Sequence, residues 1–579
     1  YEGSTLLFSL THREAPSTGE KLAMVIAVLL FASLSIWQAI ASEGFLEADG
    51  CTHYMYARWA FEYPVYFVDI WGRPFKTALY APAAAAAGLI GVRLTSLVVA
   101  IATAFIAYMI ARGQRFRWPA LALIFTLAQP LVFLHSFSEL TELPFAMLLG
   151  LAFLAYQRRR LGIMTLLAGL LPLSRPEGFG FILLTAVLLL YHRRWGLLPV
   201  LAMPVMGWQI AGAMLYREPQ HWWNWLPRHW PYAGESLYPR GPIWHFAALL
   251  PAVVGPALFP FALIGAWKSL FVAPESNDAA MAWREEARGL SGSHVGEVAE
   301  TTSSDNEIGV IRSFISSHRV RVQILIAVIP LMIFAGHSAL YALGKMASNG
   351  ELRYLLIVAP FWALLTAKGW EWVWERFIRK YEVAEINDVA STHSSYTIQP
   401  ASFKGWRSPF RYAAVAALAP ILANHGYKVL PLVQTEDWKA AARIAHWYQT
   451  SGVADDYPYI MAAHPGVAYA LDWPTLDPRL REWNRENVQT VPKGTVGVWD
   501  LVYAVHNADR RKSVDSFDAS PTPPRKWIAD WKAGKLLCLG SFDDPFVFWS
   551  LSVSDRKIDG SMTPIRVVPG DRARVERDW

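Results

Sequence analysis

The stretch KLAMVIAVLLFASLSIWQAIASEGFLEADGCTHYMYARWA, residues 21–60, joins an apolar run to a segment dense in acids, aromatics and a His. Residues 21–41 are long enough for a helix that crosses roughly 30 Å of hydrocarbon. A long polar lead precedes this run and no small-residue cleavage site follows it, so we expect a retained helix and not a signal peptide. A loop that only connected two membrane helices would not need the polar residues of 44–75, which makes this loop a candidate functional surface.

Apolar runs of this kind recur along the chain. Of its 579 residues, 54% are hydrophobic and 17% are charged, whereas a soluble domain carries about 25% charged residues. The predicted fold class is therefore a polytopic α-helical membrane protein with about eleven transmembrane helices. The predicted spans are 21–41, 89–111, 118–134, 143–157, 161–173, 178–191, 196–216, 243–268, 322–343, 353–368 and 411–431.

The charged residues predict one orientation in the membrane. The formal charge of +6 does not argue for nucleic acid, because the arginines sit in short clusters between apolar runs. The turns SFSELTE (136–142) and SRPEG (174–178) are instead rich in acids. By the positive-inside rule, residues 1–20 are a cytoplasmic tail and the first outer loop, 42–88, lies on the other side. The clustered cytoplasmic arginines are Arg112, Arg115, Arg117, Arg158, Arg159, Arg160, Arg193 and Arg194.

Three further segments differ from the apolar core of 21–431. Residues 271–320 and 381–408 are polar cytoplasmic segments that we expect catalysis not to need, and we expect 271–320 to be a largely disordered loop. Residues 432–579 predict a soluble α/β domain on the outer side, with a helix in EDWKAAARIAHWYQ (436–449). Expected strands are YPYIMAAH, TVGVWDLVYAV, KLLCLGSF and FVFWSLSVS. We place Cys51 and Cys538 on the outer side too, either as a disulfide or as two unrelated thiols.

Ionisable residues gather at the outer ends of the predicted helices. Such groups are costly near hydrocarbon and tend to face cavities, so we expect one shared outer cavity. A carboxylate in it can take a proton from an incoming hydroxyl, and cations can hold a phosphate. The candidates are Asp49, His53, Tyr54, His135, Glu139, Glu142, Arg175, Glu177, Glu351, Arg353 and Tyr354.

Four of these stretches resemble motifs of the GT-C superfamily of membrane glycosyltransferases, which use polyprenyl-phosphate-linked sugars. EADGCTHYMYARWA (47–60) looks like the first outer loop of that superfamily, and SELTELPFAMLL (138–149) is similar to its second acidic turn. LSRPEGFGFILL (173–184) looks like the Arg-Pro-Glu-Gly turn of mannosyltransferase-like members, and NGELRYLLIVAPFWALLTAKG (349–369) resembles their late Glu-x-Arg-Tyr helix start. The resemblance covers most of 20–431. One departure is Ala48-Asp49-Gly50, where many members have an Asp-Glu pair.

The resemblance implies an inverting glycosyltransferase in a bacterial plasma membrane, with its catalytic face outside the cytoplasm. A hexose, by family mannose, would pass from a polyprenyl-phosphate carrier to a glycan, protein or lipid acceptor. Asp49 would be the general base, Glu142 would position the acceptor or a divalent cation, and Arg353 with Arg175 would hold the carrier phosphate. No other cofactor and no protein partner is implied.

Each candidate also has a simpler interpretation. Asp49 can be a helix N-cap, Glu142 a first-turn acid favoured by the helix dipole, and Arg353 an interfacial anchor. Arg175 and Glu177 can simply pair with each other. His53 and His135 have no metal-ligand spacing, so polar contacts compete with a metal role. The aromatic cluster HWWNWLPRHWPY (221–232) fits an interfacial belt or a sugar-stacking surface.

Two other functions remain open from the sequence. A transporter or lipid flippase would carry charges in mid-helix, inverted repeats and paired broken helices; we find charges at helix ends and no repeat by eye. A non-catalytic structural subunit of a membrane assembly is compatible with the Ala48-Asp49-Gly50 departure.

Overall fold

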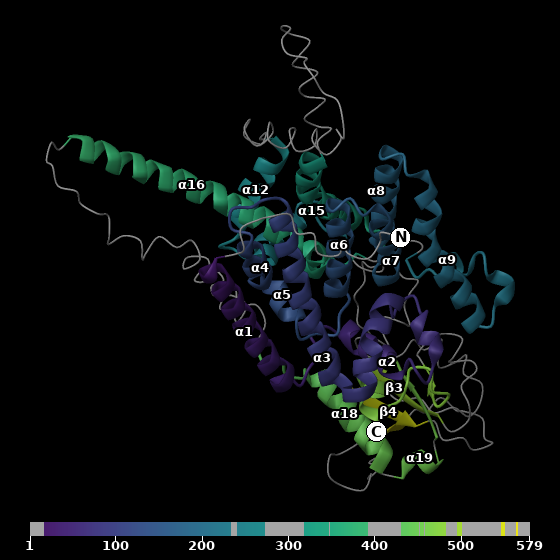
Figure 1. The fold of residues 1–579 in the computed structure, drawn as a ribbon. Coiled ribbons are helices and arrows are strands. Elements are labelled where there is room, and N and C mark those ends of the chain that lie inside the picture. The colour runs from purple at the N-terminus through teal and green to yellow at the C-terminus, as the bar shows by residue number, and fades with distance from the viewer. Residues whose placement is uncertain are drawn as a thin grey trace.

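The computed structural model describes residues 17–232, 240–271, 318–346, 348–391, 430–450, 452–456, 458–481, 495–500, 546–550 and 563–565. Figure 1 shows a bundle of helices with a small sheet and its helices at one end, next to α2. The predicted span at 411–431 lies almost wholly outside the described residues, as do the polar loop 271–320 apart from its ends and the strand predicted at 535–542.

Five described helices are long and apolar enough to cross a membrane. A sixth candidate is the pair α11 (His245–Val254) and α12 (Phe259–Phe271), which is bent by 107°. Gly255, at φ 103°, follows α11 and makes this bend. The five are α1 (Thr18–Ala41), α3 (Pro74–Gly113), η2 with α9 (Trp195–Leu197 and Leu198–Leu215), α15 (His318–Leu343), and η4 (Leu352–Val358) with the first part of α16 (Ala359–Ser391).

The prediction of about eleven spans is therefore confirmed only in part, because the described residues hold five or six candidate spans together with shorter apolar helices. The predicted span 118–134 is two short helices, α4 (Ala120–Leu127) and α5 (Pro130–His135), because Pro130 begins a new helix. The 14- to 16-residue helices α6 (Glu142–Gln157), α7 (Leu161–Ser174) and α8 (Gly178–Tyr191) rise only about 21–24 Å. The predicted span 353–368 was too short, since α16 continues to Ser391.

Helix α3 begins inside the predicted outer loop and bends at Gly88. This glycine has φ 59° and ψ −143°, a combination that side-chain-bearing residues avoid. The part before the bend packs with α2 (Ala48–Trp59) and the short η1 (Pro64–Phe67). The outer loop 42–88 is thus an ordered layer of helices that lies over the end of the bundle.

Several bundle helices end on an arginine in the left-handed conformation. Arg115, Arg159 and Arg193 have φ between 55° and 62° and follow α3, α6 and α8. In each case the next N–H returns to a carbonyl of the last turn, as in Phe116 to Ala111 at 3.1 Å. These positive φ angles belong to ordinary helix C-terminal caps, and the cation also suits the negative end of the helix dipole.

The C-terminal part of the chain builds a mixed five-stranded sheet with the order β2-β1-β3-β4-β5. Strand β1 runs parallel to β2 and β3, whereas β4 is antiparallel to β3 and β5. Ile460 of β1 lies in one buried hydrophobic cluster with Ile444 and Tyr448 of α18. Three expected strands and the expected helix correspond to described elements. Their bounds are α18 (Glu436–Thr450), α19 (Val453–Asp456), β1 (Tyr459–Ala462), α20 (Pro465–Leu471), β2 (Leu480–Arg481), β3 (Thr495–Asp500), β4 (Phe546–Ser550) and β5 (Thr563–Ile565).

This C-terminal unit contacts the outer loop directly. The Leu432 carbonyl accepts hydrogen bonds from the Glu43 and Gly44 backbone at 2.9 and 3.1 Å. The Tyr66 hydroxyl lies 2.8 Å from Thr475 Oγ1 and accepts from the Leu476 N–H at 2.8 Å. Cys51 is a free, buried thiol 3.9 Å from the Pro465 carbonyl, while Cys538 lies outside the described residues. The helix that carries Asp49 is therefore held between the bundle and the C-terminal unit.

Candidate active site

Asp49 and Arg353 connect the outer loop to the bundle. Asp49 lies in the first turn of α2, where the N-cap is Glu47, so its carboxylate is not the helix cap. Its Oδ2 accepts a hydrogen bond from Arg353 Nη2 at 2.7 Å, and its side chain is 35% exposed against 12% for Arg353. Arg353 also bonds Glu351 and lies 3.8 Å from Glu142 Oε1. Three carboxylates thus surround one guanidinium.

Glu142 and Glu177 hold the second guanidinium, that of Arg175. Glu142 begins α6 and is fully buried, with Oε1 2.5 Å from Arg175 Nη1. Glu177, in the α7–α8 turn, has its Oε1 2.9 Å from Arg175 Nη2, and His337 Nε2 of α15 lies 3.4 Å from the same oxygen. Burial alone would raise the pKa of Glu177, but Arg175 and His337 hold that pKa well below its usual range.

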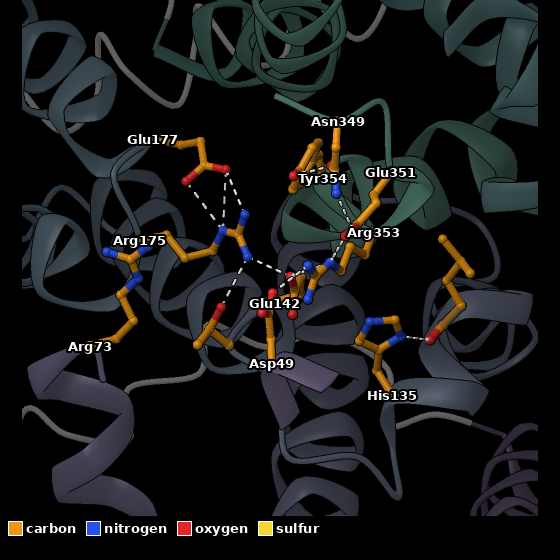
Figure 2. A network of polar contacts seen from close by, with 12 residues as sticks. Asp49, Arg73, His135, Glu142, Arg175, Glu177, Asn349, Glu351, Arg353 and Tyr354 are labelled. Carbon is orange, nitrogen blue, oxygen red and sulfur yellow. Dashed lines mark hydrogen bonds and ion pairs between the residues drawn. The ribbon is translucent and has the colours of Figure 1, made fainter. Parts of the chain in front are cut away.

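Tyr354 closes the network on the far side. Its hydroxyl donates to Asn349 Oδ1 at 2.5 Å, and the Asn349 amide donates to Glu351. Its ring stacks on His337 with centroids 5.0 Å apart, and the Arg175 guanidinium lies over the same ring at 5.7 Å. Figure 2 shows these side chains converging from α2, α6, the α7–α8 turn and the start of η4.

His135, the last residue of α5, borders the network. Its Nδ1 lies 2.9 Å from the Leu131 carbonyl. Because a carbonyl only accepts, we assign the hydrogen to Nδ1, which leaves Nε2 of the neutral ring as an acceptor. Nε2 is buried with no hydrogen-bond partner among the described residues, and in Figure 2 it is on the side of the ring facing Arg353 and Glu142. A ligand hydroxyl would satisfy this nitrogen.

Four cations surround His53, a buried residue of α2. Burial lowers the pKa of His53 well below its usual value, and the charges of Lys76, Arg73, Arg353 and Arg175 lower it further. Lys76 is fully buried and donates to the His53 carbonyl at 2.7 Å. Arg73 donates to the Ile70 carbonyl at 2.7 Å and to the Tyr232 hydroxyl. The imidazole therefore lies in a region of positive potential.

Two predicted candidates lie apart from this network. Glu139 is buried and pairs with Arg93 at 2.8 Å, while Arg93 also donates to the carbonyls of Ala39, Ser42 and Gly44. The Tyr54 ring packs against Phe45 and Tyr469 in the contact with the C-terminal unit. Both side chains have structural contacts that account for their positions. The other nine candidates lie in the network or at its edge.

Four residues of the candidate site were not among those predicted from the sequence: Arg73, Lys76, His337 and Asn349. An ionisable residue inside an apolar span is a functional candidate by default, and His337 has that signal. Arg73 comes directly before Pro74, and a proline at such a position often begins a helix. The sequence therefore also indicated a cation at the start of a helix. Lys76 gave no such signal, because a lysine at the start of an apolar run usually reaches the membrane interface.

The acids and histidines of the site do not form a metal cage. Among the described residues, no group of three or more His, Cys, Asp or Glu side chains is placed to hold a metal ion. Arginines separate the carboxylates instead, as Arg353 does for Asp49, Glu142 and Glu351. The divalent cation left open by the sequence therefore has no fitting donor set among the described residues of the site.

The aromatic cluster at 221–232 is divided between core and surface. Trp225 is fully buried and packs against Tyr216. Trp222 and Trp223 are 49% and 63% exposed, as an interfacial belt requires. Tyr232 stacks on Trp71 at 6.5 Å and binds Arg73, so only this end of the cluster reaches the site.

No protein-family model matches the chain, and no curated protein matches its sequence. The fold is similar to that of ArnT from Cupriavidus metallidurans bound to undecaprenyl phosphate, with 14% identity, 92% of this chain and 98% of that chain covered, and a TM-score of 0.50. ArnT in the apo state matches over 84% and 93% of the two chains, with 14% identity and a TM-score of 0.48. The apo oligosaccharyltransferase of Archaeoglobus fulgidus matches over 83% of this chain and 69% of that chain, with 14% identity and a TM-score of 0.42. The chain thus has an ArnT-like fold.

Proposed function

We propose that this protein is an integral membrane glycosyltransferase that moves one sugar from a polyprenyl-phosphate carrier to a hydroxyl acceptor outside the cytoplasm. We propose a hexose, with mannose as the first sugar to test because of the mannosyltransferase-like turn at 173–184. The acceptor is a glycan, a protein or a lipid.

The observation that carries this proposal is the meeting of carboxylates and cations over the end of an apolar bundle. Asp49 comes from the outer loop, whereas Glu142, Arg175 and Arg353 come from helix ends that are distant in sequence. A polyprenyl-phosphate sugar has a phosphate and a sugar at the membrane surface and a tail in lipid. The site offers cations for the phosphate, acceptor atoms for hydroxyls and apolar helices beside both.

The proposed reaction is a single displacement at the anomeric carbon. The acceptor oxygen forms a bond to C1 of the sugar, and the bond between C1 and the phosphate oxygen breaks. The electron pair of that bond leaves with the carrier, which becomes polyprenyl phosphate. The acceptor proton passes to Asp49. Because the acceptor oxygen attacks C1 from the side opposite the phosphate, configuration inverts and no covalent intermediate forms.

Asp49 is the best candidate for the base because its carboxylate is the most exposed of the acids that pair with Arg353. Glu142 is fully buried and cannot be reached by a bulky acceptor without rearrangement; it holds Arg175 and Arg353 in place. His135 Nε2 and His53 provide neutral contacts for hydroxyls.

The comparison with ArnT supports the proposal at the level of the fold. That protein was solved bound to undecaprenyl phosphate, and the likeness extends over almost the full length of both chains. A fold hosts more than one chemistry, so the site residues, and not the likeness, carry the assignment of the reaction.

A transfer assay with purified protein tests the function. The protein in liposomes would receive radiolabelled mannosyl polyprenyl phosphate together with a membrane extract as the source of acceptors. We expect labelled acceptor and free polyprenyl phosphate in equal amounts, and about 10²–10⁴-fold slower formation of both with Asp49→Asn. A protein that moved intact donor across the bilayer would be a flippase, and one that neither bound nor consumed any donor would be a structural subunit.

A further inference from the structure

We infer that the bundle carries a phospholipid site at the end away from the candidate active site. In this site Lys268 and Lys368 bind the phosphate of an anionic phospholipid, and the exposed apolar face of α12 contacts its acyl chains. The site does not depend on the proposed transfer reaction, because it involves a lipid of the surrounding membrane and lies far from Asp49.

The two lysines come from helices that cross closely at this end of the bundle. Lys368 lies about 25 Å further along the η4–α16 axis than Arg353 of the candidate active site. In Figure 1 the helices α12, α15 and α16 meet at the upper end of the bundle, away from α2, and each contacts the other two. An added Cβ on Gly265 of α12 or Gly369 of α16 would overlap the backbone of the other helix. These glycines therefore bring the two lysine-bearing helices into direct backbone contact.

Other cations lie around the two lysines. Lys268 of α12 and Arg319 of α15 are both close enough to Lys368 of α16 to act on it electrostatically. The Lys268 Nζ is 5.5 Å from the centroid of the Trp372 ring, and the Arg376 guanidinium is 5.3 Å from the same ring. Both lysines are partly buried. Like charges repel one another when they are held together, so an anion between them would be stabilised.

The carboxylates on the same stretch of α16 have other partners. Glu371 offsets part of the charge of Lys368, but its carboxylate accepts a hydrogen bond from the Trp118 N–H at 2.8 Å. Glu375 pairs with Arg117 at 3.3 Å. Within the part of the chain that the structure describes, neither lysine forms an ion pair. The protein therefore leaves positive charge at this point that a phosphate can compensate.

The face of α12 beside Lys268 is apolar and exposed. Leu263, Trp267 and Phe271 are 52%, 50% and 74% exposed, and their spacing of four residues places them on one face of the helix. In a bilayer this face meets acyl chains, and the lysine beside it reaches the level of the head groups. A phospholipid has both a phosphate and acyl chains to match these two surfaces. A soluble phosphate compound would use the lysines alone.

The positive-inside rule does not by itself explain this arrangement. Arg115, Arg159 and Arg193 follow the ends of helices in short turns, where such residues set orientation. Lys268 and Lys368 instead belong to helices that are far apart in the chain, and only the fold brings them together. Basic groups gathered between membrane helices are typical of sites for acidic lipid head groups.

Titration of the purified full-length protein with lipid tests the site, with bound phospholipid counted by native mass spectrometry. We expect the parent to bind phosphatidylglycerol more tightly than phosphatidylcholine with the same acyl chains. Lys268→Gln and Lys368→Gln should each weaken phosphatidylglycerol binding about fivefold, and the double variant about 30-fold. Replacement of both lysines by Arg should keep most of the affinity. Lys21→Gln, which removes an exposed lysine in the first turn of α1, is the control and should bind as the parent does.

Inorganic phosphate distinguishes a lipid site from a site for soluble phosphate compounds. Phosphate and sodium chloride at equal ionic strength should weaken phosphatidylglycerol binding equally, through screening alone. Specific displacement by phosphate would show that the lysines bind a soluble anion, and it would overturn the assignment. Equal affinity of the parent and the Gln double variant for phosphatidylglycerol would overturn it as well. Thermal unfolding without lipid shows whether each variant is folded, and the single and Arg variants decide the question if the Gln double variant is not. Neither failure would affect the proposed transferase function, since that function rests on other residues.

Discussion

Two buried arginines of α3, Arg73 at its N-cap and Arg93 in its interior, have nearly opposite surroundings. Arg93 pairs with Glu139 and donates to three backbone carbonyls, so nearly all of its donors are used within the protein. Arg73 has one carbonyl, one hydroxyl and two aromatic rings. Burial alone therefore does not identify a functional cation. The charge of the groups that contact the cation is what distinguishes Arg73 from Arg93.

The same comparison separates the two acidic residues of the SELTE turn. Glu139 faces Arg93, and its own position is set by the joint between α1, the outer loop and α3. Glu142, three residues later, faces Arg175 and Arg353 inside the candidate site. The first acid belongs to the fold and the second belongs to the site, although the sequence presents them as near equivalents.

The largest expected effect is that of Asp49→Asn, which tests whether an acid of the candidate site takes part in the reaction. The substitution preserves size and most hydrogen bonds, including one from Arg353, but removes the base. We expect transfer to fall by about 10²–10⁴-fold with unchanged thermal unfolding, measured with the labelled donor. If the variant retains a rate within a few-fold of the parent, Asp49 is not the base, and Glu142→Gln becomes the next test.

Arg93→Met tests whether the ion pair between Arg93 and Glu139 stabilises the fold. Removing one partner of a buried ion pair leaves Glu139 as an uncompensated charge, which costs about 3–5 kcal/mol. We expect a lower thermal unfolding midpoint or loss of expressed protein, partly recovered by Glu139→Gln in the double variant. Arg73→Met is the matched control, and it should unfold at or above the parent temperature because it removes a cation without an ion pair. Equal destabilisation by the two changes would remove the distinction between them.

The outer and inner parts of α3 can be compared through Gly88, where they meet. The φ of 59° with ψ of −143° is strained for any residue with a Cβ, so Gly88→Ala should cost about 1–3 kcal/mol. An added Cβ would lie 3.5 Å from the Tyr54 hydroxyl, an ordinary contact, so space is not the cause. Gly162→Ala, where nothing lies within 4 Å of the added carbon, is the control for a glycine inside a helix. A neutral Gly88→Ala in thermal unfolding would show that α3 does not need the bend.

Much of the site was predictable because topology gathers it. Glu142, Arg175 and Arg353 each stand at one end of a bundle helix, and Asp49 lies in α2, shortly after the end of α1. Alternating spans bring such ends to one face. Arg73 and Lys76 were not found, because their importance depends on how the outer loop folds over the bundle and buries them. The helix breaks at Pro130 and Gly255 were not predicted either, because hydropathy measures the length of an apolar run and is insensitive to a local bend.

The smallest expected effect concerns Tyr66, which connects the outer loop to the C-terminal unit. Tyr66→Phe removes a hydroxyl that contacts Thr475 and accepts from the Leu476 N–H, both at 2.8 Å. The ring can keep its stacking on Tyr56, whose centroid is 4.7 Å away. We therefore expect a loss of about 0.5–1.5 kcal/mol, seen as a small decrease in the unfolding midpoint, with transfer activity close to that of the parent. Tyr63→Phe, at the tip of the same loop, is the control. A large loss of activity with normal stability would mean that the C-terminal unit acts on the site through this contact and does more than support the helix that carries Asp49.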